Sequence, residues 1–331
     1  MSLPKVLLVS LGGTITMTAG ESGGIVPTLT AADLIAGVPG IARVAELETA
    51  SPLRLPSASL GLDDLLTLAR LLNERLAGDI DGAVVIQGTD TIEETAFVLD
   101  LLVDSVKPVV VTGAMRGPAA AGADGPANLL AATLAATSAE AGGLGTLVCL
   151  NDQLHAARFV QKSHTALPSA FTSPLTGPIG LLAEGRVCIH ARPTRTPPLA
   201  LPAYGADAPV ALLKIALGDD GRLLPALPAL GYRGCVLEGA GAGHVPAAVA
   251  PLVGDLAAAM PVVLSSRVHA GPAFTRTYGY AGSEIDLLGR GALSAGFLSG
   301  LKARLLLTLL LRGGLERRDI EARFGQYAAL V

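Results

Sequence analysis

Two glycine-threonine turns follow apolar segments of this chain, and each places a hydroxyl group where chemistry can take place. The first segment, VLLVSLGGTIT, covers residues 6–16 and brings Thr14 just past two glycines. The second, AVVIQGTDT, covers residues 83–91 and repeats this order with Thr89. Parallel strands buried on both faces are continuous apolar runs, and ligands bind beyond their C-terminal ends. The pattern therefore predicts two hydroxyl groups at one site, in a hydrolase built around threonine.

A threonine hydroxyl is a weak nucleophile at neutral pH and needs a base to activate it. A lysine in an apolar environment can serve as that base, and Lys162 in the segment ARFVQKSHT is a candidate. Asp90, which follows Thr89, could orient the lysine or hold a substrate ammonium group. Each residue also has a simpler interpretation, with Thr14 as a turn residue, Asp90 as a helix N-cap and Lys162 as a solvated side chain.

The segment after Thr14 is polar and rich in glycine, TMTAGESGG over residues 16–24. A turn that cradles phosphate should continue directly into a helix, and this segment shows no helical periodicity. We therefore expect it to form a lid over the end of the preceding strand.

The elements that must position these residues alternate along the first half of the chain. Apolar strand-like runs cover 6–11, 83–87, 109–112 and 145–150, and helical periodicity covers 62–78, 91–108 and 126–143. Asp90 and Thr91, followed by Glu93 and Glu94, are typical of a capping box at the start of the second helix. Strands that alternate with helices predict an α/β fold with a doubly wound, mostly parallel sheet.

A Pro-rich stretch without periodicity, residues 191–209, is the best candidate for a linker. Apolar strand-like runs resume after it, at 210–215, 235–243 and 261–266. We expect an N-terminal domain over 1–190 and a smaller C-terminal α/β domain over 210–331. The apolar run LLLTLLL is flanked by arginines and predicts a buried helix.

Composition excludes several classes of function. A net charge of −4 and an aromatic content of 3% without Trp argue against a nucleic-acid surface. No apolar run reaches the roughly 18 residues of a membrane span. Three cysteines, Cys149, Cys188 and Cys235, lie in apolar segments, and we expect all three to be buried small side chains. The N-terminal segment is too short for a signal-peptide core, so we expect a cytoplasmic protein.

One motif favours a different class of function. The segment CVLEGAGAGHVPAAV resembles a dinucleotide fingerprint, with Gly239, Gly241 and Gly243 after a strand. The third glycine of the pattern G-x-G-x-x-G is absent, because His244 stands at that position. An NADP-binding α/β protein is therefore a remote alternative, and a non-catalytic ligand-binding α/β module is another.

Five short sequence motifs, in this order, resemble those of the bacterial-type L-asparaginases, which are two-domain threonine amidohydrolases. They are GGTIT, QGTDTIEET, KPVVVTGAM, ADGPANL and ND…QKSHT, over residues 6–165, with weaker similarity continuing to the last helix. The resemblance implies hydrolysis of L-asparagine to L-aspartate and ammonia through an acyl-enzyme. It implies no cofactor, no metal, and a homotetramer built as a dimer of dimers. A glutaminase-asparaginase, a related amidohydrolase or a tRNA-linked amidotransferase subunit are alternatives within this resemblance.

The resemblance also implies roles for particular residues. Thr14 would be the nucleophile that attacks the side-chain amide carbon. Thr89, Asp90 and Lys162 would form a second threonine triad, in which Asp90 also binds the substrate α-ammonium group.

Substrate binding would involve further positions of the N-terminal half. Ser57 would hold the α-carboxylate, with Ser59 as an alternative register. Backbone donors near Thr89 and Ala114 would meet the oxyanion. The residue beside Ser57 is Ala58, where many asparaginases carry a polar side chain, and this difference bears on substrate preference.

The lid differs from the family pattern as well, because the first tyrosine of the chain is Tyr204 and many relatives carry a tyrosine in the lid. His244 falls where the family often places an asparagine that reaches in from a neighbouring subunit. Tyr278 and Tyr280 lie in a Gly-rich stretch close to Glu284. We hypothesise that one of these two tyrosines, donated by the adjacent protomer, replaces the lid tyrosine. The alternative is that both rings only pack at an interface.

Overall fold

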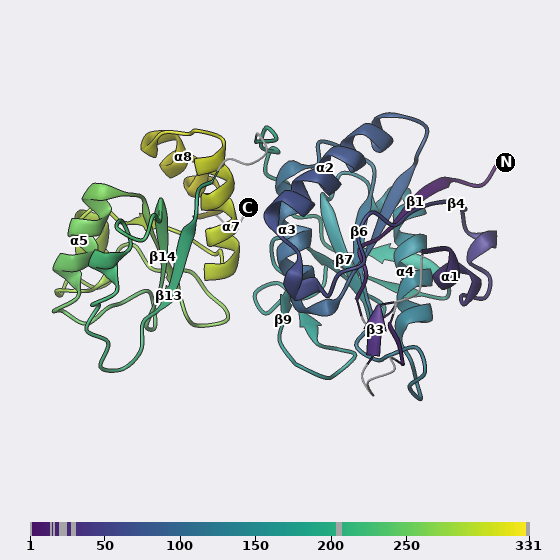
Figure 1. The fold of residues 1–331 in the computed structure, drawn as a ribbon, viewed down its shortest axis with the longest axis horizontal. Coiled ribbons are helices and arrows are strands. Elements are labelled where there is room, and N and C mark those ends of the chain that lie inside the picture. The colour runs from purple at the N-terminus through teal and green to yellow at the C-terminus, as the bar shows by residue number, and fades with distance from the viewer. Residues whose placement is uncertain are drawn as a thin grey trace. The chain divides into compact units, whose positions relative to one another are not determined.

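The computed structural model of the chain describes residues 2–13, 15, 17–19, 25–27, 31–202 and 207–328. The chain divides into two compact units, Met1–Leu199 and Ala200–Val331, shown in Figure 1. The point of division lies inside the Pro-rich stretch 191–209.

The N-terminal unit is built on one sheet of eight strands in the order β12-β11-β8-β7-β6-β5-β1-β4. The strands are β1 Lys5–Ser10, β4 Glu46–Ala50, β5 Gly82–Ile86, β6 Val109–Thr112, β7 Thr146–Leu150, β8 Gln153–Ala156, β11 Gly180–Ala183 and β12 Arg186–Ile189. The strands from β7 to β4 pair in parallel, whereas β8, β11 and β12 join by antiparallel pairing. The mostly parallel sheet predicted from the sequence is confirmed.

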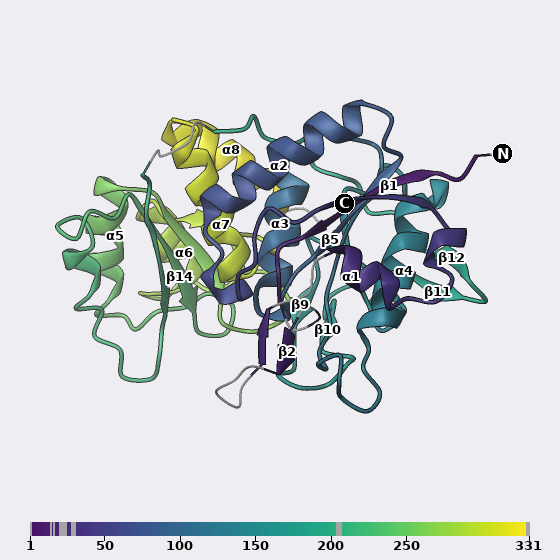
Figure 2. The ribbon, with the colours of Figure 1, turned by 45° about the vertical axis from the view of Figure 1, so that its right-hand side comes forward.

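Both faces of this sheet are covered by helices, as Figures 1 and 2 show. These helices are α1 Ala31–Ala36, α2 Leu62–Ala77, α3 Ile92–Leu102 and α4 Gly125–Thr137. Val84, Val110 and Leu147 point to one face and pack with Leu129 and Ala132 of α4. Helix α2 contacts β5, and helix α3 contacts β6 and β7. Every residue of β5 and β6 is buried, which explains why these strands do not alternate between apolar and polar residues.

The strand order reverses at β1. From β1 the chain first adds β4 on one side and then crosses to β5 on the other. In open α/β sheets, a ligand crevice forms at such a point, outside the C-terminal ends of the two strands. Both glycine-threonine turns follow strands that end there.

Two predicted helices end earlier than the sequence pattern indicated. Helix α3 stops at Leu102, because Val103 is extended (φ −88°, ψ 112°), and the prediction of a helix over 91–108 is wrong beyond that residue. The guanidinium group of Arg195 donates to the carbonyl oxygens of Asp100, Val103 and Ser105, so a distant side chain terminates the helix. Helix α4 likewise stops short of the predicted residue 143 and is followed by the 3₁₀ turn η5 Ala139–Ala141.

Shorter elements surround the C-terminal ends of the strands. Two antiparallel pairs lie there, β2 Met17–Ala19 with β3 Ile25–Pro27 and β9 Gln161–Lys162 with β10 Phe171–Thr172. Among the 3₁₀ turns, η3 Ser57–Ser59 follows β4 and η4 Thr89–Thr91 follows β5, whereas η2 Ile41–Arg43 precedes β4.

The C-terminal unit is a smaller α/β unit with a parallel sheet of four strands, in the order β13-β14-β15-β16. Its elements are β13 Val210–Lys214, η6 Leu224–Ala226, β14 Gly234–Gly239, α5 Ala250–Ala259, β15 Val262–Ser266, α6 Glu284–Gly289, β16 Leu293–Ser294, α7 Gly300–Arg312 and α8 Arg317–Ala328. The apolar run LLLTLLL lies in α7 and is buried along most of its length, as predicted.

The three cysteines differ in their surroundings. Cys149 and Cys235 are buried, and burial raises the pKa of the Cys235 thiol to about 12 and raises the pKa of Cys149 as well. Cys188 is exposed, so the prediction of a third buried cysteine is wrong. It lies on β12, which is the edge strand of the large sheet. Among the helices that the structure describes, none combines the length and the apolar character needed to cross a bilayer.

Candidate functional site

The two glycine turns meet at the point where the strand order reverses. Gly13 has a φ of +96°, and a Cβ atom at this position would lie 2.0 Å from the backbone nitrogen of Gly88. Only a glycine permits this approach, because a side chain would occupy the space of the second turn. The backbone leading to Thr14 therefore runs against the backbone leading to Thr89. Thr14 itself, the predicted nucleophile, lies outside the described residues.

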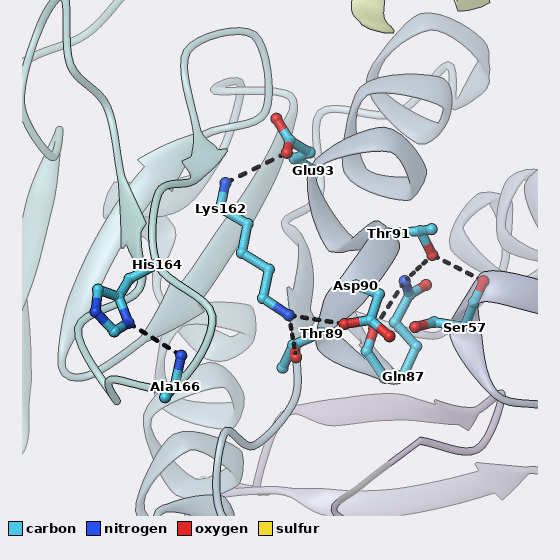
Figure 3. A network of polar contacts seen from close by, with 10 residues as sticks. Ser57, Gln87, Thr89, Asp90, Thr91, Glu93, Lys162, His164 and Ala166 are labelled. Carbon is cyan, nitrogen blue, oxygen red and sulfur yellow. Dashed lines mark hydrogen bonds and ion pairs between the residues drawn. The ribbon is translucent and has the colours of Figure 1, made fainter. Parts of the chain in front are cut away.

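Lys162 connects the second turn to a separate part of the chain, as Figure 3 shows. Its Nζ atom lies 3.0 Å from Thr89 Oγ1 and 2.8 Å from Asp90 Oδ1. The lysine side chain is 16% exposed and that of Asp90 is 68% exposed. The structure thus brings together the three residues Thr89, Asp90 and Lys162 that the sequence pattern proposed as one group. A hydroxyl within hydrogen-bonding distance of a lysine nitrogen has the arrangement of an activated hydroxyl.

Glu93 holds the strand that carries Lys162. It is buried in the first turn of α3, and its Oε1 atom accepts a hydrogen bond of 3.3 Å from the backbone nitrogen of Lys162. The predicted capping box is wrong, because the N-cap residue Thr91 makes no side-chain cap bond and instead donates to Ser57 O at 3.0 Å. Sequence reasoning assigned the glutamates of this turn to capping. The signal it missed was that an acidic residue in the first turn of a helix covering a sheet can face the sheet.

Ser57 lies in η3 and presents a buried hydroxyl to the same turn. Its side chain is 3% exposed, and its Oγ atom has no hydrogen-bond partner among the described residues. A Cβ atom at Gly88 would lie 2.7 Å from this Oγ, so the hydroxyl faces the turn directly. Ser59, the alternative register, is exposed. A buried hydroxyl without a partner is uncommon and is typical of a place where a ligand completes the hydrogen bonding.

The loop after β6 carries Ala114, whose backbone was predicted to meet an oxyanion. Asn128 of α4 donates to the carbonyl oxygen of Gly113 at 2.9 Å. Asp124, at the start of the same helix, accepts hydrogen bonds of 2.9 and 2.8 Å from the backbone nitrogens of the two residues after Ala114. Both polar residues belong to the sequence motif ADGPANL, and their hydrogen bonds hold this loop in place.

The second group of predicted site residues forms a cluster within the C-terminal unit. His244 follows β14, and its Nε2 atom lies 3.1 Å from Glu284 Oε2, while its Nδ1 atom lies 2.9 Å from the hydroxyl of Tyr280. The ring of Tyr278 meets that of His244 edge-on, with centroids 4.9 Å apart. All four residues that sequence reasoning grouped here are thus in contact.

Glu284 is the fully buried member of this cluster. Its Oε1 atom accepts hydrogen bonds from the backbone nitrogens of Thr277 and Tyr278, at 2.8 and 2.7 Å. Burial by itself raises the pKa of a carboxyl group, but these two N–H donors together with His244 outweigh burial and lower the pKa of Glu284. The residue is therefore a carboxylate at neutral pH.

The dinucleotide-like motif has a different geometry from a fingerprint turn. After β14 the chain forms a short bridge between Ala240 and His244, and α5 begins only at Ala250. A pyrophosphate site requires the glycine turn to open directly into a helix N-terminus.

The sheet of this α/β fold carries a hydroxyl group, a lysine and a carboxylate at its switch point. This arrangement is typical of an enzyme active site. Comparison with known proteins gives the family. Residues 5–195 match the N-terminal asparaginase domain, and residues 209–324 match the glutaminase/asparaginase C-terminal domain. The chain belongs to the asparaginase family of amidohydrolases.

Full-length relatives support this assignment. A probable L-asparaginase of Deinococcus radiodurans is 37% identical, with 98% of each chain covered. A glutaminase-asparaginase of Pseudomonas fluorescens is 31% identical over 98% of this chain and 91% of its own length. The crystal structure of a probable cytoplasmic L-asparaginase from Campylobacter jejuni superimposes with a TM-score of 0.85 at 33% identity, covering 97% of this chain and 99% of that one.

Proposed function

We propose that this protein hydrolyses L-asparagine to L-aspartate and ammonia through an acyl-enzyme on Thr14. The observation that carries the proposal is the contact of Lys162 with Thr89 and Asp90, beside the backbone that leads to Thr14. The family assignment and the resemblance of GGTIT to the family's nucleophile turn support the role of Thr14.

The reaction has two steps in this proposal. In the first, the Thr14 hydroxyl attacks the side-chain amide carbon and loses its proton, and the tetrahedral intermediate expels ammonia. Backbone N–H groups near Thr89 and Ala114 stabilise the oxyanion. In the second, water attacks the Thr14 ester and aspartate leaves. Lys162, through the Thr89 hydroxyl, assists proton transfer in both steps.

Two further residues bind the substrate backbone in this proposal. Asp90 directs an exposed carboxylate outward and binds the α-ammonium group. Ser57 offers its buried, unpartnered hydroxyl to the α-carboxylate. L-Glutamine is the second substrate to consider, since the Pseudomonas relative carries both activities in its name.

We further propose a cytoplasmic homotetramer built from two dimers, in which the cluster of His244, Tyr278, Tyr280 and Glu284 completes the site of a neighbouring protomer. A tyrosine hydroxyl from this cluster takes the part of the absent lid tyrosine. The domain boundaries that we propose are 1–190 and 210–331, with a linker over 191–209.

Ammonia release from L-asparagine, L-glutamine and D-asparagine tests this function, with purified protein and no added nucleotide or metal. We expect L-asparagine to be the best substrate. Thr89→Val and Lys162→Met should each lower kcat by about 10²–10⁴-fold. Lys5→Met, which changes a half-buried lysine at the start of β1, is the matched control and should retain activity. Tight NADP binding without ammonia release would contradict the proposal.

A further inference from the structure

A buried glutamine connects the turn that carries Ser57 to the turn that carries Thr89. Gln87 follows the last residue of β5, and its side chain is fully buried. Its Nε2 atom lies 3.3 Å from the carbonyl oxygen of Gly88 and 3.3 Å from Thr91 Oγ1. Thr91 in turn donates to Ser57 O at 3.0 Å, so that Gln87, Thr91 and Ser57 form one row of hydrogen bonds (Figure 3).

We propose that Gln87 is a positioning residue, which acts through Thr91 to hold Ser57 at the place where the α-carboxylate of the substrate binds. This inference rests on the proposed function and deepens it, because it names the residues that align the carboxylate-binding hydroxyl. Gln87 and Thr91 do not touch the substrate in this arrangement. They determine how well the site recognises the head group of an α-amino acid.

The orientation of the Gln87 amide follows from which of its neighbours can donate. The carbonyl oxygen of Gly88 can only accept a hydrogen bond. Thr91 Oγ1 gives its single hydrogen to Ser57 O, so it is an acceptor toward Gln87 as well. Both contacts therefore require the NH₂ end of the amide, and each of its two hydrogens has a partner.

The other end of the amide explains why stability alone does not account for this residue. Gln87 Oε1 is buried and has no hydrogen-bond partner among the described residues. An unsatisfied buried acceptor is unfavourable, and an apolar side chain of similar length would avoid it. The two donors of Gln87 are therefore the feature that this position needs.

Ser57 depends on this support because its own turn is short. The turn η3 has three residues, and Ser57 O accepts one hydrogen bond within it, from Leu60 N at 3.2 Å. The bond from Thr91 to the same oxygen ties this turn to the start of α3. The Ser57 hydroxyl itself lies against Gly88, where a Cβ atom would be 2.7 Å from Oγ. A displacement of about 1 Å is sufficient to misalign a substrate-binding group, so the row of hydrogen bonds controls its placement.

Two amides that each lack one part of the asparagine head group test this role. β-Alaninamide has no α-carboxylate, and succinamate has no α-ammonium group. Gln87→Met and Thr91→Val should each raise KM for L-asparagine and for succinamate by about 10-fold, because the hydroxyl that binds their carboxylate is misplaced, and should change kcat by less than about threefold. With β-alaninamide, both variants should lose less than about twofold in kcat/KM. Equal losses on all three amides would overturn the positioning role.

Thermal unfolding separates positioning from folding. Gln87→Met keeps the length of the side chain and removes the unsatisfied Oε1, so its Tm should stay within about 3 °C of the wild type. Gln153→Met, which changes a half-buried glutamine on β8, is the matched control and should leave Tm and kcat/KM unchanged. Thr91→Val removes a single hydroxyl and gives the same comparison from the other end of the contact. A fall in Tm of more than about 10 °C in both Gln87→Met and Thr91→Val would show that the row serves the fold instead.

Binding of L-aspartate requires no turnover and reports on the same contact. Isothermal titration calorimetry should find the Kd for L-aspartate raised about 10-fold in Gln87→Met and to a similar extent in Ser57→Ala. The double variant should bind no more weakly than Ser57→Ala alone, because Gln87 acts through Ser57. Effects that add in the double variant would overturn this order of action.

The same titrations keep the two proposals apart. If L-aspartate binds and the variants respond as described but the wild type releases no ammonia from any amide, the proposed hydrolysis fails and the positioning role stands. If the wild type hydrolyses L-asparagine but Gln87→Met and Thr91→Val bind L-aspartate with the wild-type Kd, the positioning role alone fails.

Discussion

Single side chains decide the chemistry at the switch point of the large sheet. The lysine nitrogen of Lys162 lies within hydrogen-bonding distance of both Thr89 and Asp90, but the carboxylate is mostly exposed. An ion pair that is open to solvent contributes little to the stability of the fold. The position of this pair beside Thr89 therefore points to a role in the site rather than in stability. The order of the sequence motifs along the chain was sufficient to predict that these three residues form one group. Glu93 was missed, because its contact is with a backbone nitrogen 69 residues away.

The two serines of η3 give a prediction at this scale. Ser57→Ala should raise KM for L-asparagine by about 10-fold or more, because a buried hydroxyl that faces Gly88 is lost to the substrate. Ser59→Ala is the matched control and should change KM by less than about twofold, since Ser59 is exposed. Steady-state kinetics on both variants check this, and a larger effect at Ser59 would assign the α-carboxylate to the other register.

At the scale of elements, the apolar strands and the helix α2 could be predicted because local periodicity and burial agree along them. The C-terminal end of α3 could not, because the residue that terminates it lies elsewhere in the chain. Arg195 donates to the carbonyl oxygen of Asp100 in the last turn, where a helix needs partners, and to those of Val103 and Ser105 just beyond it. The pair of β9 and β10 was also missed, since strands of two residues leave no periodic signal.

Arg195 accordingly makes a prediction about stability. Arg195→Met should lower the free energy of unfolding by about 2–4 kcal/mol, because it leaves several carbonyl oxygens at the end of α3 without a donor. Arg192→Met removes a comparable side chain that is exposed and donates to the carbonyl oxygens of Glu140 and Gly142. Its effect should stay below about 1 kcal/mol. Urea denaturation compares the two variants, and equal losses would show that the last turn of α3 does not depend on Arg195.

The strand β8 makes the folding of the large sheet sensitive to pH. His155 on this strand is fully buried, with Nδ1 at 2.9 Å from Ser173 Oγ, and burial lowers its pKa from 6.5 to about 4. The unfolded chain therefore binds a proton below pH 6.5, while the folded protein does not until about pH 4. The stabilisation is complete above pH 6.5 and is lost as the pH falls to 4, by about 3 kcal/mol.

The variant His155→Gln cannot titrate, and it tests this pH dependence. Its free energy of unfolding should fall less steeply than that of the wild type between pH 6.5 and 4, and the curves should converge at the acidic end. Urea denaturation at several pH values measures the difference in the free energy of unfolding between the two proteins. The contribution of the carboxyl groups cancels in this difference, because both proteins carry the same ones. Parallel curves for the two proteins would show that His155 is protonated equally in both states.

At the scale of the whole molecule, the sequence predicted two α/β units but could not predict how the copies assemble. Each unit contains one group of polar residues at the C-terminal ends of its parallel strands, namely Lys162 with its partners and the cluster around His244. A meeting of the two groups at an interface between copies stays a prediction, because no local pattern in the sequence encodes such an interface.

Complementation tests whether the two groups meet across subunits. Lys162→Met and Glu284→Gln should each be inactive alone, because each lacks one half of every site. Co-expression with two different tags should yield mixed dimers that recover roughly half of the wild-type activity per dimer, since one of the two sites then contains both intact halves. Mixed dimers as inactive as the parents would show that each protomer builds its own site.

The proposed hydrolysis of L-asparagine depends on Thr14 as the nucleophile. The most direct measurement is ammonia release by Thr14→Ala beside Thr16→Ala, a change to another hydroxyl two residues further along the same segment, with circular dichroism to show that both variants fold. Thr14→Ala should lose at least about 10³-fold in kcat, whereas Thr16→Ala should keep activity within about tenfold of the wild type. Folded Thr14→Ala protein with turnover close to that of the wild type would show that Thr14 is not the nucleophile.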